Sequence, residues 1–172
     1  MTYKPTMAAS LAVQVPTPGA GVVHPLGKRG YGPLRATDFW EDKQEYDIHA
    51  NQRVLLICQI ERSSAVDCID EIAQMPGIDG LWIGPADLAQ SVGHLGQADH
   101  PDVQDCIART IAAANQHNKD WGIPVGSVED LMRYVKQGGT LMTITSSSRI
   151  MMNVSKECSQ AGLSALVKAG LR

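Results

Sequence analysis

Two apolar runs that each end in a carboxylate, with an amphipathic stretch between them, constrain this chain more than any other feature. The first run covers residues 54–60 and leads into Glu61, and the second covers residues 80–86 and leads into Asp87. The stretch between them has a helical period, so the segment predicts a strand, a helix and a second strand. Strands joined in this way are parallel, and ligands bind at the edge where their carboxyl ends lie. Two carboxylates at that edge suit a hard divalent cation.

The alternation of strand and helix continues toward the end of the chain. We expect strands at residues 53–60, 79–84, 122–126 and 140–145, and helices at 63–75, 127–137 and 149–168, with a further helix beginning at Pro101. Four such units predict an α/β fold with a parallel sheet. A complete eight-unit barrel needs about 200–250 residues or more, and this chain has 172. The sequence therefore predicts either half to five-eighths of a barrel or a small open sheet.

The N-terminal part has a different composition. Residues 1–37 are rich in Pro and Gly, and we expect an irregular segment with a short strand at 11–15 and an ordered loop at 24–33. Residues 38–172 then form the α/β unit, which opens with a short helix or turn.

Charge and cysteine content exclude several classes of function. The formal net charge is −3 with no basic cluster, which argues against nucleic acid or an anionic membrane as a partner. No apolar run approaches the roughly 20 residues of a membrane span. The four cysteines lie far apart without a C-x-x-C pair, which favours buried, reduced thiols in a cytoplasmic protein.

Several of these residues also carry a likeness to a known family. They are residues 27–32, 59–61, 77–88 and 100–103. With these motifs the chain resembles the HpcH/HpaI family of metal-dependent pyruvate aldolases over roughly residues 24–168. The resemblance implies a partial (β/α)8 TIM barrel of the phosphoenolpyruvate/pyruvate-binding type. The chain would be N-terminally truncated and would form the C-terminal half, about four to five βα units.

The resemblance also implies roles for individual residues. Glu61 and Asp87 would bind Mg²⁺ or Mn²⁺, with Co²⁺ or Zn²⁺ as further candidates, and the metal would stabilise a pyruvate enolate as a Lewis acid. Gln59 and the backbone at Ala86 would contact the substrate, and Arg29 would belong to an active-site loop. The substrate-binding residues would thus be Gln59, Gly84, Pro85, Ala86 and Asp87. The structural alternatives are helix caps or Arg partners for the carboxylates, a core amide for Gln59 and a solvated charge for Arg29.

The chain departs from the family pattern in its catalytic groups. The catalytic His and the early Arg of the family have no counterpart here, and residues 146–149 read Ser-Ser-Ser-Arg where an Asp is usual. His24 and His94 are weak candidates for a replacement base. We expect a carbon–carbon lyase acting on pyruvate or a related 2-oxo acid, reduced to decarboxylation of oxaloacetate. The alternative is an inactive relative that acts as a pseudoenzyme or interaction subunit. In both cases we expect a homo-oligomer or association with a full-length partner.

Overall fold

The computed structural model describes residue 30 and residues 33–171. The expected strand at 11–15, most of the loop 24–33 and the candidate residues His24 and Arg29 lie outside this part of the chain, and their predictions stay untested.

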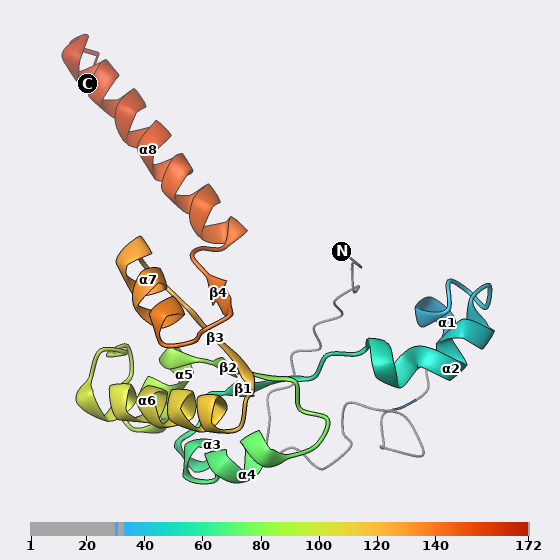
Figure 1. Cartoon of the computed structure of the whole chain (residues 1–172). Coiled ribbons are helices and arrows are strands. Elements are labelled where there is room, and N and C mark those ends of the chain that lie inside the picture. The colour runs from blue at the N-terminus through green and yellow to red at the C-terminus, as the bar shows by residue number, and fades with distance from the viewer. Residues whose placement is uncertain (1–29, 31–32, 172) are drawn as a thin grey trace.

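Four parallel strands form the sheet at the centre of the molecule (Figure 1). They are β1 (Ile57–Ile60), β2 (Gly80–Ile83), β3 (Asp120–Pro124) and β4 (Leu141–Thr143), and they lie in chain order. Every neighbouring pair is parallel, because a helical crossover separates each strand from the next. The predicted α/β fold with a parallel sheet is confirmed.

The strand register divides the sheet residues between two faces. One row across the sheet contains Gln59, Trp82, Gly122 and Leu141. The preceding row contains Cys58, Leu81 and Trp121, each at most 1% exposed. Because side chains alternate along a strand, the buried row lies under the helices and the row that begins with Gln59 faces the other way. The polar Gln59 side chain is therefore placed away from the apolar core.

Helices cover the buried face of the sheet. The helices that do so are α3 (Ser63–Asp67), α4 (Ile69–Gln74), α5 (Pro85–Ser91), α6 (Pro101–Gln116) and α7 (Val128–Lys136), whereas α8 (Ser147–Lys168) has no buried residue. Helix α6 lies at the centre of this layer and contacts α3, α4, α5, β2 and β3. The predicted apolar stripe of α6 is confirmed, since Val103, Ile107 and Ala114 are buried. Tyr134 brings α7 against the core by an edge contact with Trp121.

Several local predictions differ from the structure. The third strand, expected at 122–126, is observed at Asp120–Pro124. The strand expected from residue 53 begins at Ile57, because α2 (Lys43–Arg53), which follows α1 (Pro33–Ala36), extends to Arg53. The single helix expected at 63–75 is divided at Cys68, whose φ of −114° is not helical. Helix α5 was not expected, since it begins at Pro85 within the second apolar run.

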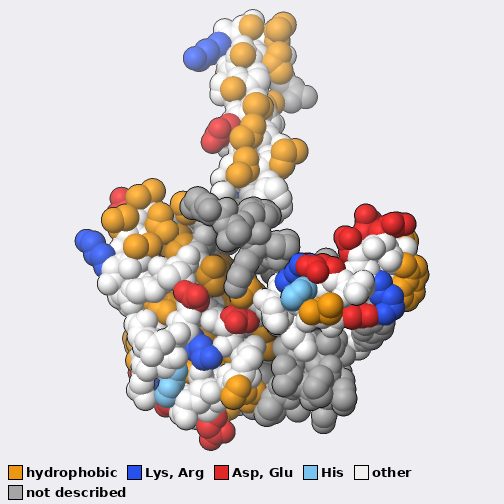
Figure 2. All heavy atoms as spheres, turned by 45° about the vertical axis from the view of Figure 1, so that its right-hand side comes forward, with side chains coloured by type: hydrophobic (Ala, Val, Ile, Leu, Met, Phe, Trp, Pro, Cys, Tyr) orange, Lys and Arg blue, Asp and Glu red, His pale blue; other side chains and the backbone are white. Residues whose placement is uncertain are grey.

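Helix α8 extends away from the rest of the molecule (Figure 1). It begins after Ser146, whose side-chain oxygen accepts a hydrogen bond from the Arg149 backbone N–H at 3.2 Å. None of its residues is buried, although it carries apolar side chains along its length (Figure 2). No described helix combines the length and the apolar character that crossing a membrane requires.

Candidate functional site

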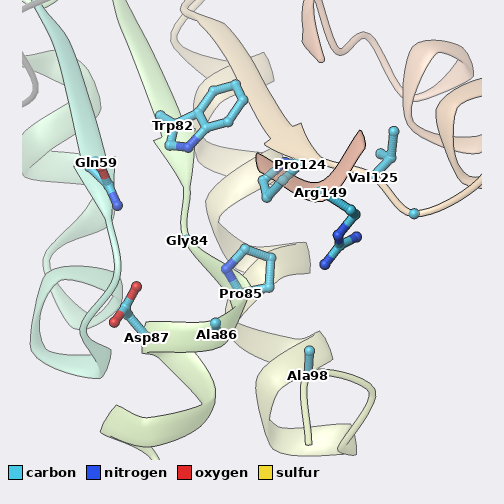
Figure 3. Close-up of a pocket in the computed structure, with 11 residues that line it drawn as sticks. Gln59, Trp82, Gly84, Pro85, Ala86, Asp87, Ala98, Pro124, Val125 and Arg149 are labelled. Carbon is cyan, nitrogen blue, oxygen red and sulfur yellow. The ribbon is translucent and has the colours of Figure 1, made fainter. Parts of the chain in front are cut away.

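A pocket of about 370 Å³ opens at the carboxyl ends of the strands (Figure 3). Its lining consists of Gln59, Trp82, Gly84, Pro85, Ala86, Asp87, Ala98, Pro124, Val125, Gly126 and Arg149. All five residues that the sequence assigned to substrate binding lie in this lining. They come together because Gln59 lies on β1, beside the end of β2 and the first turn of α5.

Glu61 lies immediately after β1 and next to Gln59. The Gln59 Nε2 atom donates a hydrogen bond to Glu61 Oε2 at 2.7 Å. Gly84 lies against both residues, since a Cβ atom there would lie 3.2 Å from Glu61 Cβ and 3.4 Å from Gln59 Nε2. The absence of a side chain at Gly84 thus leaves room for the Gln59–Glu61 pair. Glu61 is half-buried and is not part of the pocket lining itself.

Asp87 is an exposed residue in the first turn of α5. Pro85 occupies the start of this helix, where its missing N–H costs no hydrogen bond. Within residues 33–171, neither Asp87 nor Glu61 forms an ion pair with Lys, Arg or His. Two carboxylates at one sheet edge without a described cationic partner are a donor set that fits Mg²⁺ or Mn²⁺.

Arg149 is a pocket residue that the sequence analysis did not assign to the site. It belongs to the first turn of α8, and its guanidinium enters the pocket from the side opposite Asp87 (Figure 3). No carboxylate of the described chain forms an ion pair with it. The available sequence signal was its place directly after β4, at the same sheet edge as Glu61 and Asp87.

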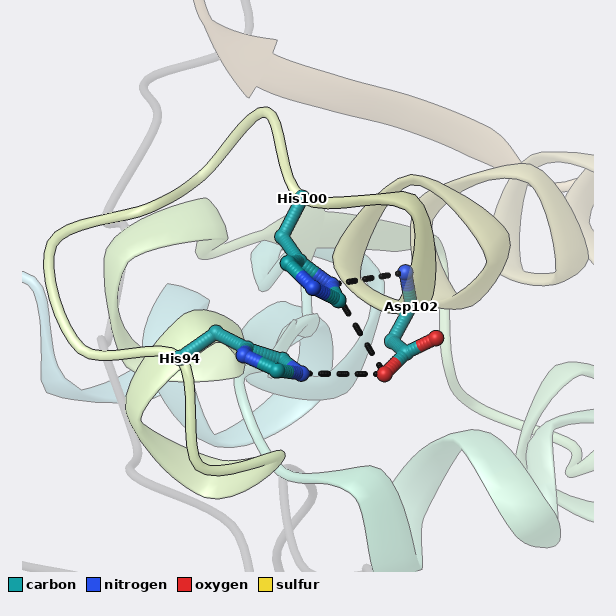
Figure 4. Close-up of side chains that lie close together, drawn as sticks. All are labelled: His94, His100 and Asp102. Atoms are coloured by element: carbon teal, nitrogen blue, oxygen red, sulfur yellow. Dashed lines mark hydrogen bonds and ion pairs between the residues drawn. The ribbon is translucent and has the colours of Figure 1, made fainter.

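A second polar cluster lies on the loop between α5 and α6 (Figure 4). His94 Nε2 lies 2.9 Å from Asp102 Oδ2, and His100 Nδ1 lies 3.6 Å from the same oxygen. The two rings are stacked with centroids 3.3 Å apart, and His100 Nδ1 accepts a hydrogen bond from the Asp102 backbone N–H. His94 is therefore engaged in this cluster and does not line the pocket.

This cluster offers three possible metal ligands within 4.8 Å of one another. An imidazole nitrogen binds a metal that lies in the plane of the ring. Two stacked, nearly parallel rings have no nearby position that lies in both planes, so one metal ion cannot bind both. The cluster as it stands is therefore a hydrogen-bonded cap at the start of α6, and it can hold a metal only after the rings move apart.

Two of the four cysteines, Cys58 and Cys106, have the environment of structural thiols, and the expectation of burial is wrong for Cys158. All four are free; Cys58 and Cys106 are buried, Cys68 is half-buried and Cys158 is exposed. Burial raises the pKa of the Cys58 thiol to about 11, opposed by the nearby charge of Lys119. Burial also raises the pKa of Cys106. Since the thiolate is the reactive form, both buried thiols stay inert near neutral pH. A cytoplasmic location stays a prediction.

The comparisons with known proteins decide the family. The family model for HpcH/HpaI aldolase/citrate lyase matches residues 6–153. The chain belongs to the HpcH/HpaI aldolase/citrate lyase family. Similar curated proteins are the 5-keto-4-deoxy-D-glucarate aldolases of Salmonella paratyphi C and Salmonella arizonae, both 38% identical over 122 residues. This match covers 71% of the chain and 48% of each relative, so the chain spans about half the length of these relatives.

Solved structures of the HpcH/HpaI family support the same assignment. A family protein from Burkholderia cenocepacia J2315 matches with a TM-score of 0.72 and 36% identity, over 80% of this chain and 53% of that one. An HpcH/HpaI aldolase from Desulfitobacterium hafniense DCB-2 matches with a TM-score of 0.68 and 26% identity, over 80% and 54% of the two chains. Macrophomate synthase matches with a TM-score of 0.65 and 25% identity, over 86% and 53%. The fold is a partial TIM barrel.

Proposed function

We propose that this chain carries a metal-dependent carbon–carbon lyase site for pyruvate or a related 2-oxo acid. The observation that supports this most strongly is the pair Glu61 and Asp87, two carboxylates without a described cationic partner beside a pocket at the carboxyl edge of a parallel sheet. The aldolase names of the similar Salmonella proteins agree with this class of reaction.

The residues of the site have separable roles in this proposal. Glu61 and Asp87 would hold Mg²⁺ or Mn²⁺, and that cation would supply Lewis-acid stabilisation of negative charge on a substrate oxygen. Gln59 fixes the Glu61 carboxylate by the 2.7 Å hydrogen bond and presents the rest of its amide to the pocket. The N–H of Ala86 lies in the first turn of α5, where backbone N–H groups have no helical acceptor and are available to a substrate oxygen.

Oxaloacetate decarboxylation is the reaction that this set of residues supports best. No histidine lines the pocket among the described residues, and this reaction needs no base to form the enolate. The C3–C4 bond breaks, its electron pair stays on C3 as the pyruvate enolate, and C4 leaves as CO₂. The enolate then takes a proton from water. The groups near Glu61 and Asp87 thus act by orienting the 2-oxo acid and by stabilising charge.

The test is decarboxylation of oxaloacetate with Mn²⁺, corrected for the reaction of Mn²⁺ without protein. We expect Glu61→Gln and Asp87→Asn each to lower the protein-dependent rate by at least about 100-fold, the order of loss seen when an electrostatic stabiliser is removed. The matched control is His94→Gln with His100→Gln, which removes the other candidate metal cluster and should leave the rate unchanged. Equal activity in wild-type protein and Glu61→Gln would overturn the proposal.

The second candidate function is that of an inactive relative that serves as an interaction subunit. It is favoured by the exposure of α8, where Ile150, Met151 and Val154 are each more than half exposed. In the described chain β1 and β4 also form the two ends of the sheet, and open edges favour association. The partner would be a second copy or a full-length relative. A folded protein that binds neither Mn²⁺ nor pyruvate but associates with a partner chain would favour this function.

A further inference from the structure

We propose that Arg149 binds the second carboxylate of a dicarboxylic 2-oxo acid and so makes the pocket prefer such diacids to pyruvate. This inference rests on the proposed function of the same pocket, in which the 2-oxo acid end lies beside the cation site of Glu61 and Asp87. Arg149 is not one of the residues to which the family resemblance gave a role.

The position of Arg149 is fixed by the start of α8. Ser146 caps this helix by accepting a hydrogen bond from the Arg149 backbone N–H, which holds the residue directly beyond the end of β4. From there its side chain lines the main pocket together with Pro124 and Val125. It also lines an adjoining hollow of about 200 Å³, where Thr145 and Ser146 provide hydroxyl groups and no acidic residue is present.

The charge of Arg149 is available to a ligand. Among the described residues that line the main pocket, Asp87 is the only acidic one, and it forms no ion pair with Arg149. A guanidinium with hydroxyl groups beside it is suited to a carboxylate, since its planar N–H groups match the two oxygens of that group. We therefore assign this end of the pocket to an anionic substituent.

The strand order decides which carboxylate reaches Arg149. Gln59 belongs to β1 and Glu61 follows it, Asp87 follows β2, and Arg149 follows β4 at the other end of the four-stranded sheet. Neighbouring strands lie about 4.8 Å apart. The acidic pair and the guanidinium therefore lie apart along the sheet edge and contact opposite ends of a ligand. Pyruvate, with three carbons, has its only carboxylate beside its keto group and leaves Arg149 without an anion. A four- or five-carbon 2-oxo diacid provides one at the far end.

The experiment compares two stable ligands by calorimetric titration in the presence of Mn²⁺. These are pyruvate and 2-oxoglutarate, titrated into wild-type protein, Arg149→Gln and Arg149→Lys. We expect wild-type protein to bind 2-oxoglutarate at least about 10-fold more tightly than pyruvate, and Arg149→Gln to lose about 10- to 100-fold for 2-oxoglutarate, as for a hydrogen bond between charged groups. Pyruvate affinity should change by less than about 2-fold, and Arg149→Lys should restore part of the loss.

Arg133→Gln is the matched control, because Arg133 pairs with Asp130 and lies over the Tyr134 ring outside the pocket. It should leave both affinities unchanged. If Arg149→Gln weakens both ligands equally, or neither, the inference about Arg149 is wrong while the proposed function stands. If folded wild-type protein binds neither ligand with Mn²⁺, the proposed function fails and this inference fails with it.

Discussion

Gly84 packs directly against two residues of the candidate site, Glu61 and Gln59. Its φ of −105° is accessible to any residue. Glycine is therefore needed here for its missing side chain and not for its backbone freedom. We expect Gly84→Ala to push Glu61 and Gln59 away from their present positions, because the new Cβ would lie 3.2 Å from Glu61 Cβ. Pyruvate affinity with Mn²⁺ should fall by about 10-fold, as for misplaced substituents in a preorganised site.

The control for this variant is Gly126→Ala. Gly126 also lines the pocket, but an added Cβ there meets no atom within 4 Å. Calorimetric titration of both variants, with thermal melting to establish that both are folded, separates the two cases. Equal pyruvate affinities for Gly84→Ala and wild-type protein would contradict the role assigned to Gly84.

Cysteine reactivity gives a second prediction at the residue scale. Cys158 is exposed, whereas burial raises the pKa of Cys58 to about 11. At pH 8 a thiol reagent should therefore label Cys158 at least about 100-fold faster than Cys58, since the thiolate is the reacting species and must be accessible. Mass spectrometry of peptides after timed labelling measures both rates. Labelling of Cys58 at the rate of Cys158 in folded protein would contradict the burial of β1.

The same pKa shift predicts how stability depends on pH. The unfolded chain ionises Cys58 near its ordinary pKa of 9.0, whereas the folded chain keeps the proton until about pH 11. Between these values the folded state binds more protons, so the free energy of unfolding contributed by this thiol falls as pH rises above 9. Urea unfolding at pH 8 and pH 10 should show a smaller decrease in Cys58→Ala than in wild-type protein. An equal decrease in both would contradict the prediction.

The elements differ in how far the sequence could define them. Helix α6 was predictable because Pro101 marks its start and its apolar residues recur at helical spacing. Helix α5 was not predictable, because one apolar run continues from β2 through Gly84 and Pro85 into α5. The start of β1 was placed too early because the apolar residues at 54–56 extend the run, although the residue pairing with β2 begins only at Ile57. Apolar runs therefore located the strands without fixing their ends.

The candidate site, like the strands, was predictable from the sequence only in part. Gln59, Glu61 and Asp87 each adjoin a strand end, so local sequence placed them at one edge of the sheet. Arg149 lies beyond the fourth strand, and the direction of its side chain depends on where α8 begins and how it leaves the sheet. Packing between distant elements sets that direction, and no local pattern records it.

Gly122 lies opposite Leu141 in the pairing of β3 with β4, and it gives a prediction at the scale of the elements. A Cβ at Gly122 would collide with the backbone carbonyl oxygen of Leu141. We expect Gly122→Ala to separate β4 from β3 and to lower the free energy of unfolding by about 3 kcal/mol or more, at the upper end of overpacking costs. Urea unfolding measures this loss, with Gly162→Ala as a control because Gly162 has no neighbour within 4 Å. Equal losses in the two variants would contradict the close pairing.

At the scale of the whole molecule, two helices of the described chain expose apolar side chains that no other described element covers. Helix α7 exposes Val128, Met132 and Val135, each by at least 46%. Helix α8 adds a stripe of Ile150, Val154, Cys158, Ala161 and Ala165, at the spacing of one helical face. In a closed barrel the sheet has no open edge and every helix packs against a neighbour. The exposed apolar side chains of α7 and α8 and the sheet ends at β1 and β4 therefore favour association.

We accordingly expect the purified chain to form a homo-oligomer through the apolar stripe of α8. Val154→Glu with Ala161→Glu places two charges on that stripe and should convert the oligomer to monomer, because burying unpaired carboxylates in an interface is strongly unfavourable. Asn153→Glu with Gln160→Glu adds the same charge on another side of α8 and should leave the oligomer intact. Size-exclusion chromatography with light scattering measures the mass of all three proteins. A wild-type monomer, or equal dissociation of both variants, would show that α8 is not the contact, and association would then have to occur through the edges of β1 and β4.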